Sequence, residues 1–205
     1  MSAFYQLAYR LGFHPWEDLA DHQPFADQLL SLIAREESGA GPPYGRALDL
    51  GCGSAVWGVQ LARRGWQVTG VDNVPRALDR ARERIRETGV QMNLVEGDVT
   101  RLQAAQVGAG HRLVLDTGTF HGLDPEQRRA MGQRVSELAS DDTTVLLDCF
   151  ASGRRWPLPR GCTQTDVEEA FPSWQVTDVV VADSAPDRLA RALRFDEVFY
   201  RLRRR

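Results

Sequence analysis

Ala47-Leu48-Asp49-Leu50-Gly51-Cys52-Gly53-Ser54-Ala55 is the stretch of this sequence that decides its fold class. Apolar, β-rich residues precede the two glycines and a helical pattern follows them, which indicates the first turn between a strand and a helix. Glycines there let the backbone approach a ligand closely, and the start of the helix offers unpaired N–H groups. The stretch therefore predicts a ligand site, although a tight turn without a ligand would use the same glycines.

Strands and helices alternate along most of the chain. Five β-rich runs predict strands at residues 46–51, 66–72, 90–95, 112–116 and 143–150. Apolar spacing predicts helices at residues 24–37, 54–64, 75–87 and 125–139. The run Thr165–Glu168 reads as a capping box that opens a short helix to about residue 171. This alternation predicts a doubly wound, Rossmann-like α/β sheet with parallel pairing and right-handed crossovers.

The rhythm changes near the C-terminus. Residues 174–182 and 193–202 read as two strands with no helix between them that is long enough for a crossover. They predict an antiparallel hairpin that closes one edge of the sheet. A chain of 205 residues suits a single domain. We divide it into an N-terminal segment at 1–45, a core at 46–150 and a C-terminal segment at 151–205.

Composition excludes several classes of protein. Apolar residues make up 42% and charged residues 26%, which is globular, and a net charge of −3 gives no reason to expect a nucleic-acid binder. All 25 basic residues are arginine, which excludes a Schiff-base or P-loop lysine. The three cysteines form no C-x-x-C pair, so neither a metal nor a disulfide framework is indicated. We expect a cytoplasmic location without a signal peptide or membrane span.

Acidic residues at the predicted strand ends indicate the kind of ligand. Asp72 ends the second strand, 21 residues after Gly51, where a carboxylate accepts the hydroxyls of a ribose, and Asp98 follows the third strand, within reach of an adenine amine. Val56 stands where a dinucleotide fingerprint needs glycine or alanine, which disfavours pyrophosphate. Asp49 suits an ammonium group. Together they favour S-adenosylmethionine, although each carboxylate alone is also explained as a structural cap.

The run Asp49-Leu50-Gly51-Cys52-Gly53 resembles the first motif of class I S-adenosylmethionine-dependent methyltransferases, D/E-x-G-x-G-x-G, with Ala55 in place of the third glycine. The resemblance covers residues 46–150 well and implies a seven-stranded sheet with an antiparallel last strand. It also implies a set of cofactor-binding residues: Asp49, Leu50, Gly51, Cys52, Gly53, Asp72, Asn73, Asp98, Val99, Asp116 and Thr117.

The segment Asp116-Thr117-Gly118-Thr119-Phe120-His121-Gly122 follows the fourth strand. Asp116 matches the family's fourth motif, near the site of methyl transfer, and is a candidate catalytic residue. The segment lacks the [DN]-P-P-[YF] pattern of enzymes that methylate amides or base nitrogens. Phe120 is expected to contact the substrate. His121 is expected to be a general base or a donor that orients the substrate, unless it only packs at a helix edge.

Aromatic residues outside the core are further candidates for contact with the methyl acceptor. They are Tyr5, Tyr9 and Trp16 in the N-terminal segment and Trp156 after the fifth strand. In the family, such N-terminal extensions often fold over the cofactor as a lid, although these side chains are equally suited to docking the segment on the sheet. A solvent-exposed loop is the more common explanation for a segment such as the one that carries Trp156.

The sequence thus predicts transfer of a methyl group to an O, S or N atom of a small aromatic or heterocyclic molecule. The thiopurine, tellurite-resistance and heterocyclic-toxin methyltransferases of bacteria are the nearest group that it resembles. The alternatives are an RNA or protein methyltransferase, or a catalytically silent cofactor-binding subunit. The sequence leaves a homodimer open.

Overall fold

The computed structural model describes residues 23–153, 161–182 and 197–205. Its strands are β1 (Arg46–Leu50), β2 (Gln67–Asp72), β3 (Met92–Glu96), β4 (His111–Thr117), β5 (Ala139–Phe150), β6 (Trp174–Val181) and β7 (Glu197–Arg204). Its helices are α2 (Gln23–Glu37), α3 (Val56–Arg64), α4 (Pro75–Thr88), α5 (Ala104–Val107), α6 (Pro125–Leu138) and α7 (Gln164–Ala170), with a 3₁₀ turn, η2, at Phe120–Gly122.

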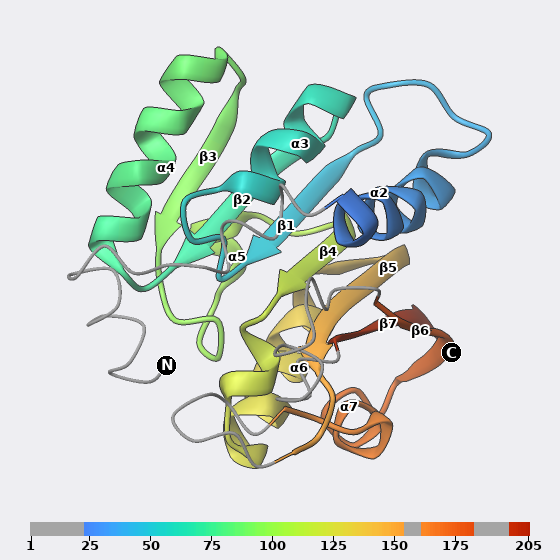
Figure 1. The fold of residues 1–205 in the computed structure, drawn as a ribbon. Helices are drawn as coiled ribbons and strands as arrows, with labels where there is room; N and C mark the ends of the chain where they lie inside the picture. The colour runs from blue at the N-terminus through green and yellow to red at the C-terminus, as the bar shows by residue number, and fades with distance from the viewer. Residues whose placement is uncertain (1–22, 154–160, 183–196) are drawn as a thin grey trace.

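The seven strands form one sheet in the order β3-β2-β1-β4-β5-β7-β6 (Figure 1). Strands β1 to β5 pair in parallel, and β7 runs antiparallel to both of its neighbours, β5 and β6. This confirms the predicted fold class and the C-terminal hairpin. Strand order reverses between β1 and β4, so the carboxyl ends of these two strands flank the crevice where such sheets bind ligands.

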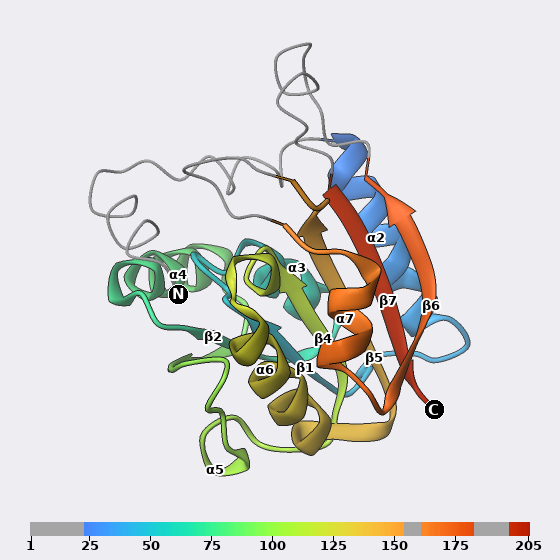
Figure 2. The ribbon, with the colours of Figure 1, turned by 90° about the horizontal axis from the view of Figure 1, so that it is seen from below.

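Two apolar layers cover the sheet. Helices α2 and α3 pack on one face, where Phe25, Leu29, Ile33 and Leu61 are fully buried. Helices α6 and α7 pack on the other face through residues such as Met131. Figure 2 shows the sheet between these two layers. Among the described helices, none combines the length and the apolar composition that crossing a bilayer requires.

Most element boundaries agree with the sequence pattern, but the predicted start of helix α7 is wrong. Helix α7 begins at Gln164 because Thr163 is its N-cap, with Asp166 completing the capping box. The sequence pattern predicts the box at Thr165 and Glu168, two residues further on. Both pairs satisfy the sequence rule, so only the backbone conformation at Thr163 distinguishes them.

Candidate functional site

The glycine loop between β1 and α3 has an unusual backbone. Gly51, Gly53 and Ala55 adopt positive φ angles of 68°, 53° and 59°. Ala55, the N-cap of α3, therefore takes the left-handed conformation at the position where the motif has its third glycine. A side chain on Gly51 would place its Cβ 1.8 Å from Thr119 Oγ1, because the loop after β4 packs directly against the glycine loop. Glycine at position 51 is thus needed for both conformation and space.

Asp49 is buried beside this loop, with 1% of its surface exposed. Within the described part of the chain, neither of its carboxylate oxygens has a hydrogen-bond partner of normal geometry. Burial, and then the charges of Asp116 and Asp72, raise the pKa of Asp49 to about 7, and the nearby Gly58 amide opposes this shift. A buried carboxylate without a partner fits the ammonium group of an amino-acid tail, so the residues present fit S-adenosylmethionine.

Asp72 connects the loops after β1 and β2. Its Oδ2 accepts the Gly53 N–H at 2.9 Å and its Oδ1 accepts the Val74 N–H at 2.8 Å. Burial raises the pKa of Asp72, and these backbone hydrogen bonds oppose the shift. A carboxylate has about four acceptor positions, so two such bonds leave capacity for ribose hydroxyls.

The other residues predicted for the cofactor lie in different surroundings. Asp98 is exposed after β3 and accepts the Thr100 N–H and hydroxyl at 2.9 and 2.7 Å. Cys52 is buried, and burial raises the pKa of its thiol, which agrees with a small packing residue rather than a nucleophile. Leu50 and Val99 belong to the hydrophobic core, and Asn73 and Thr117 are half-buried at the carboxyl ends of β2 and β4.

Asp116 organises the loop after β4. It is fully buried, its Oδ1 accepts the N–H groups of Gly118 and Thr119, and its Oδ2 accepts that of Phe120 at 3.1 Å. Burial raises the pKa of Asp116 to about 7, against these three bonds. Phe120 has no exposed surface and packs against Phe171, with ring centroids 6.0 Å apart. Phe120 thus packs in the hydrophobic core, and the expected contact with the substrate stays a prediction.

The His121 imidazole is buried and held by the end of β5. Its Nδ1 accepts the Phe150 N–H at 3.0 Å, and its ring stacks on the Phe150 ring at 4.4 Å with an interplanar angle of 18°. Only 4% of His121 is exposed. The side chain is thus fixed at the carboxyl ends of β4 and β5, beside the predicted transfer site.

Arg128 of α6 is a site residue that sequence reasoning missed. Its buried guanidinium donates to the carbonyls of Phe120 and His121 at 3.2 Å each and to that of Gly161 at 2.8 Å. It also pairs with Asp166 at 3.3 Å. A single arginine within a helical pattern gives no sequence signal for this, because its partners are backbone atoms of distant segments.

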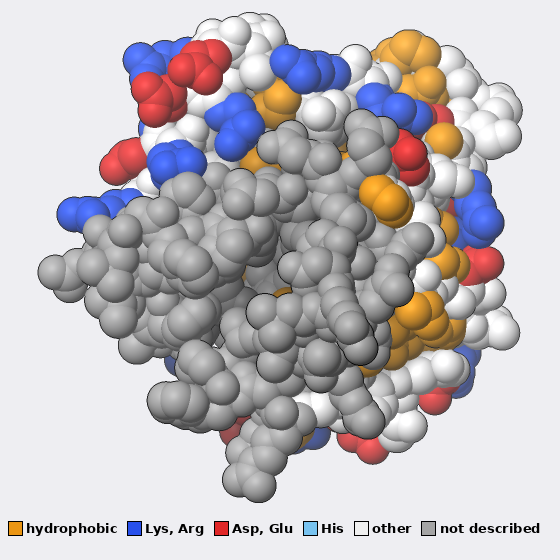
Figure 3. All heavy atoms as spheres, in the orientation of Figure 1, with side chains coloured by type: hydrophobic (Ala, Val, Ile, Leu, Met, Phe, Trp, Pro, Cys, Tyr) orange, Lys and Arg blue, Asp and Glu red, His pale blue; other side chains and the backbone are white. Residues whose placement is uncertain are grey.

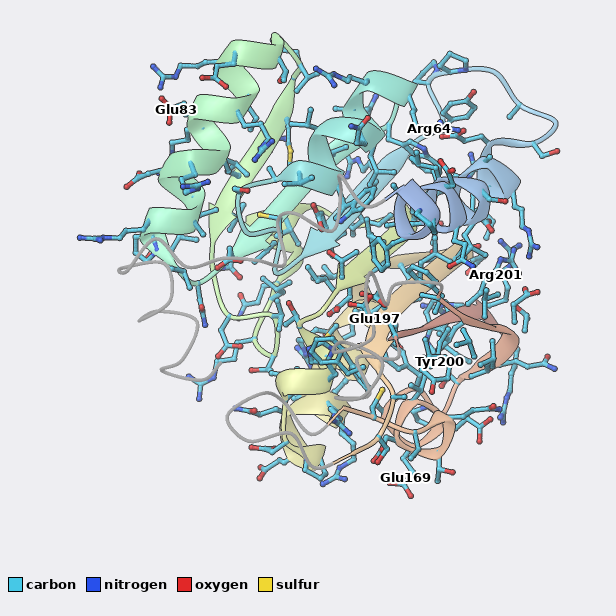
Figure 4. All side chains as sticks on the ribbon, viewed as in Figure 1. Arg64, Glu83, Glu169, Glu197, Tyr200 and Arg201 are labelled. Atoms are coloured by element: carbon cyan, nitrogen blue, oxygen red, sulfur yellow. The ribbon has the colours of Figure 1, made fainter. Side chains whose placement is uncertain are left out.

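Sequence reasoning also missed two buried carboxylates, Asp148 at the end of β5 and Glu197 at the start of β7. Figure 4 labels Glu197. Burial, and then the charges of Glu197 and Asp116, raise the pKa of Asp148 well above its usual value. The predicted substrate contacts Tyr5, Tyr9, Trp16 and Trp156 lie outside the described residues. Among the described residues, no cluster of His, Cys, Asp and Glu is arranged to hold a metal ion.

Residues 47–142 match the family model described as "Methyltransferase domain". The ribosomal RNA small subunit methyltransferase C of Alcanivorax borkumensis is 41% identical over 70 residues, which cover 34% of this chain and 21% of that protein. The 2-heptyl-1-hydroxyquinolin-4(1H)-one methyltransferase of Mycobacteroides abscessus is 26% identical over 137 residues, which cover 66% of this chain and 56% of that protein. The chain thus spans about half or less of the length of these relatives.

Solved structures share the fold. The N-methyltransferase NodS of Bradyrhizobium japonicum, in complex with S-adenosyl-L-homocysteine, superimposes with a TM-score of 0.70 at 18% identity, over 88% of each chain. TehB of Haemophilus influenzae superimposes with a TM-score of 0.66 at 16% identity, over 85% of this chain and 62% of that chain. Fold, glycine loop and the match over residues 47–142 make the chain similar to class I methyltransferases, and the solved structures show that it shares their fold. S-adenosylmethionine is the cofactor of this class.

Proposed function

We propose that this protein transfers the methyl group of S-adenosylmethionine to an O, S or N atom of a small aromatic or heterocyclic molecule. The observation that carries the cofactor half of this proposal is the buried carboxylate of Asp49, which lies beside the left-handed glycine loop and has no hydrogen-bond partner among the residues that the structure describes. The acceptor half is supported by the quinolone methyltransferase among the relatives. It is also supported by the net charge of −3, which does not favour a polyanionic substrate.

Each cofactor residue then has a distinct role. Asp49 binds the ammonium group, the backbone of Gly51 and Gly53 lines the amino-acid tail, Asp72 accepts the ribose hydroxyls, and Asp98 lies at the adenine. When bound, S-adenosylmethionine supplies a methyl group on a positively charged sulfur. Transfer requires only that a lone pair be aligned with that methyl carbon while water is excluded.

The loop after β4 supplies the acceptor side. Asp116 acts through the backbone that it holds rather than by touching the acceptor, because it has no exposed surface and its oxygens accept three amides of this loop. Thr117 ends β4 and His121 lies in the 3₁₀ turn that follows, while Thr119 between them packs against Gly51 of the glycine loop. We assign His121 to the acceptor.

Calorimetric titration with S-adenosylhomocysteine and S-adenosylmethionine, with NADH as the control, tests the cofactor. We expect binding of both adenosyl compounds and none of NADH; the reverse result would contradict the proposal. A panel of phenols, thiols and N-heterocycles then tests turnover, with product detected by mass spectrometry. Cofactor binding without turnover of any member would favour a silent cofactor-binding subunit.

RNA methylation is the second candidate, because a ribosomal RNA methyltransferase is 41% identical to this chain over 70 residues. Against it, Figure 3 shows Arg and acidic side chains intermixed over α4 rather than gathered into one basic surface. Binding to ribosomal RNA that weakens steeply with added salt would favour this candidate. A cytoplasmic location and a homodimer stay predictions.

A further inference from the structure

We infer that His121 is a neutral hydrogen-bond donor through Nε2 and not a general base, so that the enzyme selects methyl acceptors that present a lone pair without a proton. The inference rests on the proposed function. The sequence left two roles open for His121, a general base and a donor that orients the substrate, and the inference favours the donor.

The tautomer follows from one contact. The Phe150 backbone N–H is a donor in every protonation state, and it points at His121 Nδ1 from 3.0 Å. The ring nitrogen that receives it must carry a lone pair. A neutral imidazole has a single N–H, which is therefore on Nε2.

This tautomer leaves His121 no position for a second proton. Nε2 already carries one, and protonation of Nδ1 would set one N–H against another and remove the partner of the buried Phe150 amide. Leaving a buried N–H without an acceptor destabilises the fold, which disfavours the protonated ring. A ring held in this way donates well and accepts a proton poorly.

The surroundings keep the ring from turning over. The ring stacks on Phe150, and Arg128 holds the His121 carbonyl at 3.2 Å. A Cβ on Gly118 would lie 3.5 Å from the His121 Cε1 and 3.9 Å from Nε2, so the Nε2 edge lies along the loop after β4. Gly118 has a φ of 106°, which a side chain would strain.

The chemistry of the acceptor follows from a donor at this place. The atom that meets Nε2–H is an oxygen, sulfur or ring nitrogen with a lone pair. Its lone pair forms the new bond to the methyl carbon, and the electrons of the broken carbon–sulfur bond remain on sulfur. No proton passes to His121. The favoured acceptors are acidic hydroxyl, thiol or ring N–H compounds that are already ionised near neutral pH.

Nitrogen NMR of the full chain tests the tautomer without any turnover. The chain has four histidines. Long-range ¹H–¹⁵N spectra of ¹⁵N-histidine-labelled protein at pH 7, compared with the His121→Asn protein, identify the His121 signals. We expect a protonated Nε2 and an unprotonated Nδ1. A proton on Nδ1, or on both nitrogens, would overturn the inference.

Two matched substitutions test the role in turnover. His121→Gln places an amide N–H₂ near the position of Nε2 and cannot act as a base. His121→Asn places a polar atom near Nδ1 and lacks the donor. We expect Gln to retain activity within about tenfold of wild type and Asn to lose more, since removing one hydrogen bond to a charged group lowers a rate by roughly 10- to 100-fold. Equal losses of roughly 100-fold or more in both would indicate a base and overturn the inference.

The choice of acceptor supplies a further test. We expect wild-type protein to methylate 4-nitrophenol faster than phenol, and the advantage to shrink in His121→Asn. Equal rates in wild type would contradict the acceptor class. Titration with S-adenosylhomocysteine separates the two proposals: its failure in wild type removes the proposed function, whereas normal binding in all variants leaves only the role of His121 at issue.

Discussion

Asp49 is the residue on which we propose that cofactor binding depends. Its carboxyl group is almost wholly buried, and burial raises its pKa to about 7, whereas an unfolded chain has an aspartate pKa of about 3.9. The native state therefore binds more protons than the unfolded state between these values, so ionisation of Asp49 destabilises the ligand-free fold as the pH rises. A cation that binds at Asp49 offsets this destabilisation, because it pairs with the ionised carboxylate.

The first prediction concerns pH. Because only the ionised Asp49 binds an ammonium group, we expect S-adenosylhomocysteine to bind about tenfold more weakly at pH 6 than at pH 8. In Asp49→Asn, we expect weaker binding at pH 8 and little dependence on pH. The ligand-free variant should unfold at a higher temperature than wild type at pH 8. Calorimetry and thermal unfolding measure these opposite effects, and equal pH dependence in both proteins would contradict the role of Asp49.

The second prediction concerns Arg128. Its removal leaves three carbonyls without their donor, so we expect Arg128→Met to lower the free energy of unfolding by about 3 kcal/mol. Arg134→Met, on the same helix, removes only a partly exposed pair with Glu137 and should cost less than about 1 kcal/mol. Urea unfolding measures both. A similar cost in the two variants would mean that the Arg128 contacts stabilise nothing.

At the scale of elements, the residue at which a helix begins sets the positions of the side chains in its first turn. Helix α6 begins as the sequence predicts, with Asp124 as N-cap and Pro125 in the first turn. Helix α7 begins one residue after Thr163, whose hydroxyl accepts the Asp166 N–H at 3.2 Å. This start brings Asp166 to Arg128, so the cap also connects α7 to the loop that carries His121.

The third prediction compares two threonines of this helix. Thr163→Ala removes the N-cap and should lower the free energy of unfolding by about 1 kcal/mol. Thr165→Ala, in the first turn, should change it by less than about 0.5 kcal/mol. Chemical unfolding of both variants distinguishes them. A larger effect at Thr165 would place the cap where the sequence pattern first suggested it.

At the scale of the whole molecule, Glu36 connects helix α2 to strands β5 and β7 of the sheet. This buried carboxylate accepts the Arg201 Nε–H at 2.8 Å and the Thr144 hydroxyl. Figure 4 shows Arg201 of β7 close to α2. The contacts connect a segment before the first strand with two strands from the second half of the chain, so they form only when the whole sheet is assembled.

The fourth prediction follows from that network. Glu36→Leu leaves Arg201 without its principal partner, and we expect a loss of about 3 kcal/mol in the free energy of unfolding. Replacing both residues by Met should recover part of this loss, because no charge is then left buried. Arg35→Met, which breaks only the exposed pair with Asp178, is the control and should change little. Additive losses in the double variant would contradict the coupling.

The sequence by itself determined the features that local spacing controls. Apolar periodicity indicated the strands and helices that the structure shows. The spacing of Asp49, Gly51 and Asp72 predicts a cofactor site at the carboxyl ends of the strands, and this site stays a prediction. Each of these depends on neighbours in the chain. Parallel strands always carry their carboxyl ends to the same edge, so the approximate meeting point follows as well.

Only the tertiary structure decided which way the side chains near that edge face. Phe120 and His121 are adjacent in sequence, yet one is a core residue and the other stacks on Phe150 with its Nδ1 occupied. Arg128 gains its role from the carbonyls of distant loops. Hydrogen bonds and packing between segments far apart in sequence set these outcomes, and no local pattern encodes a partner that only folding brings within reach.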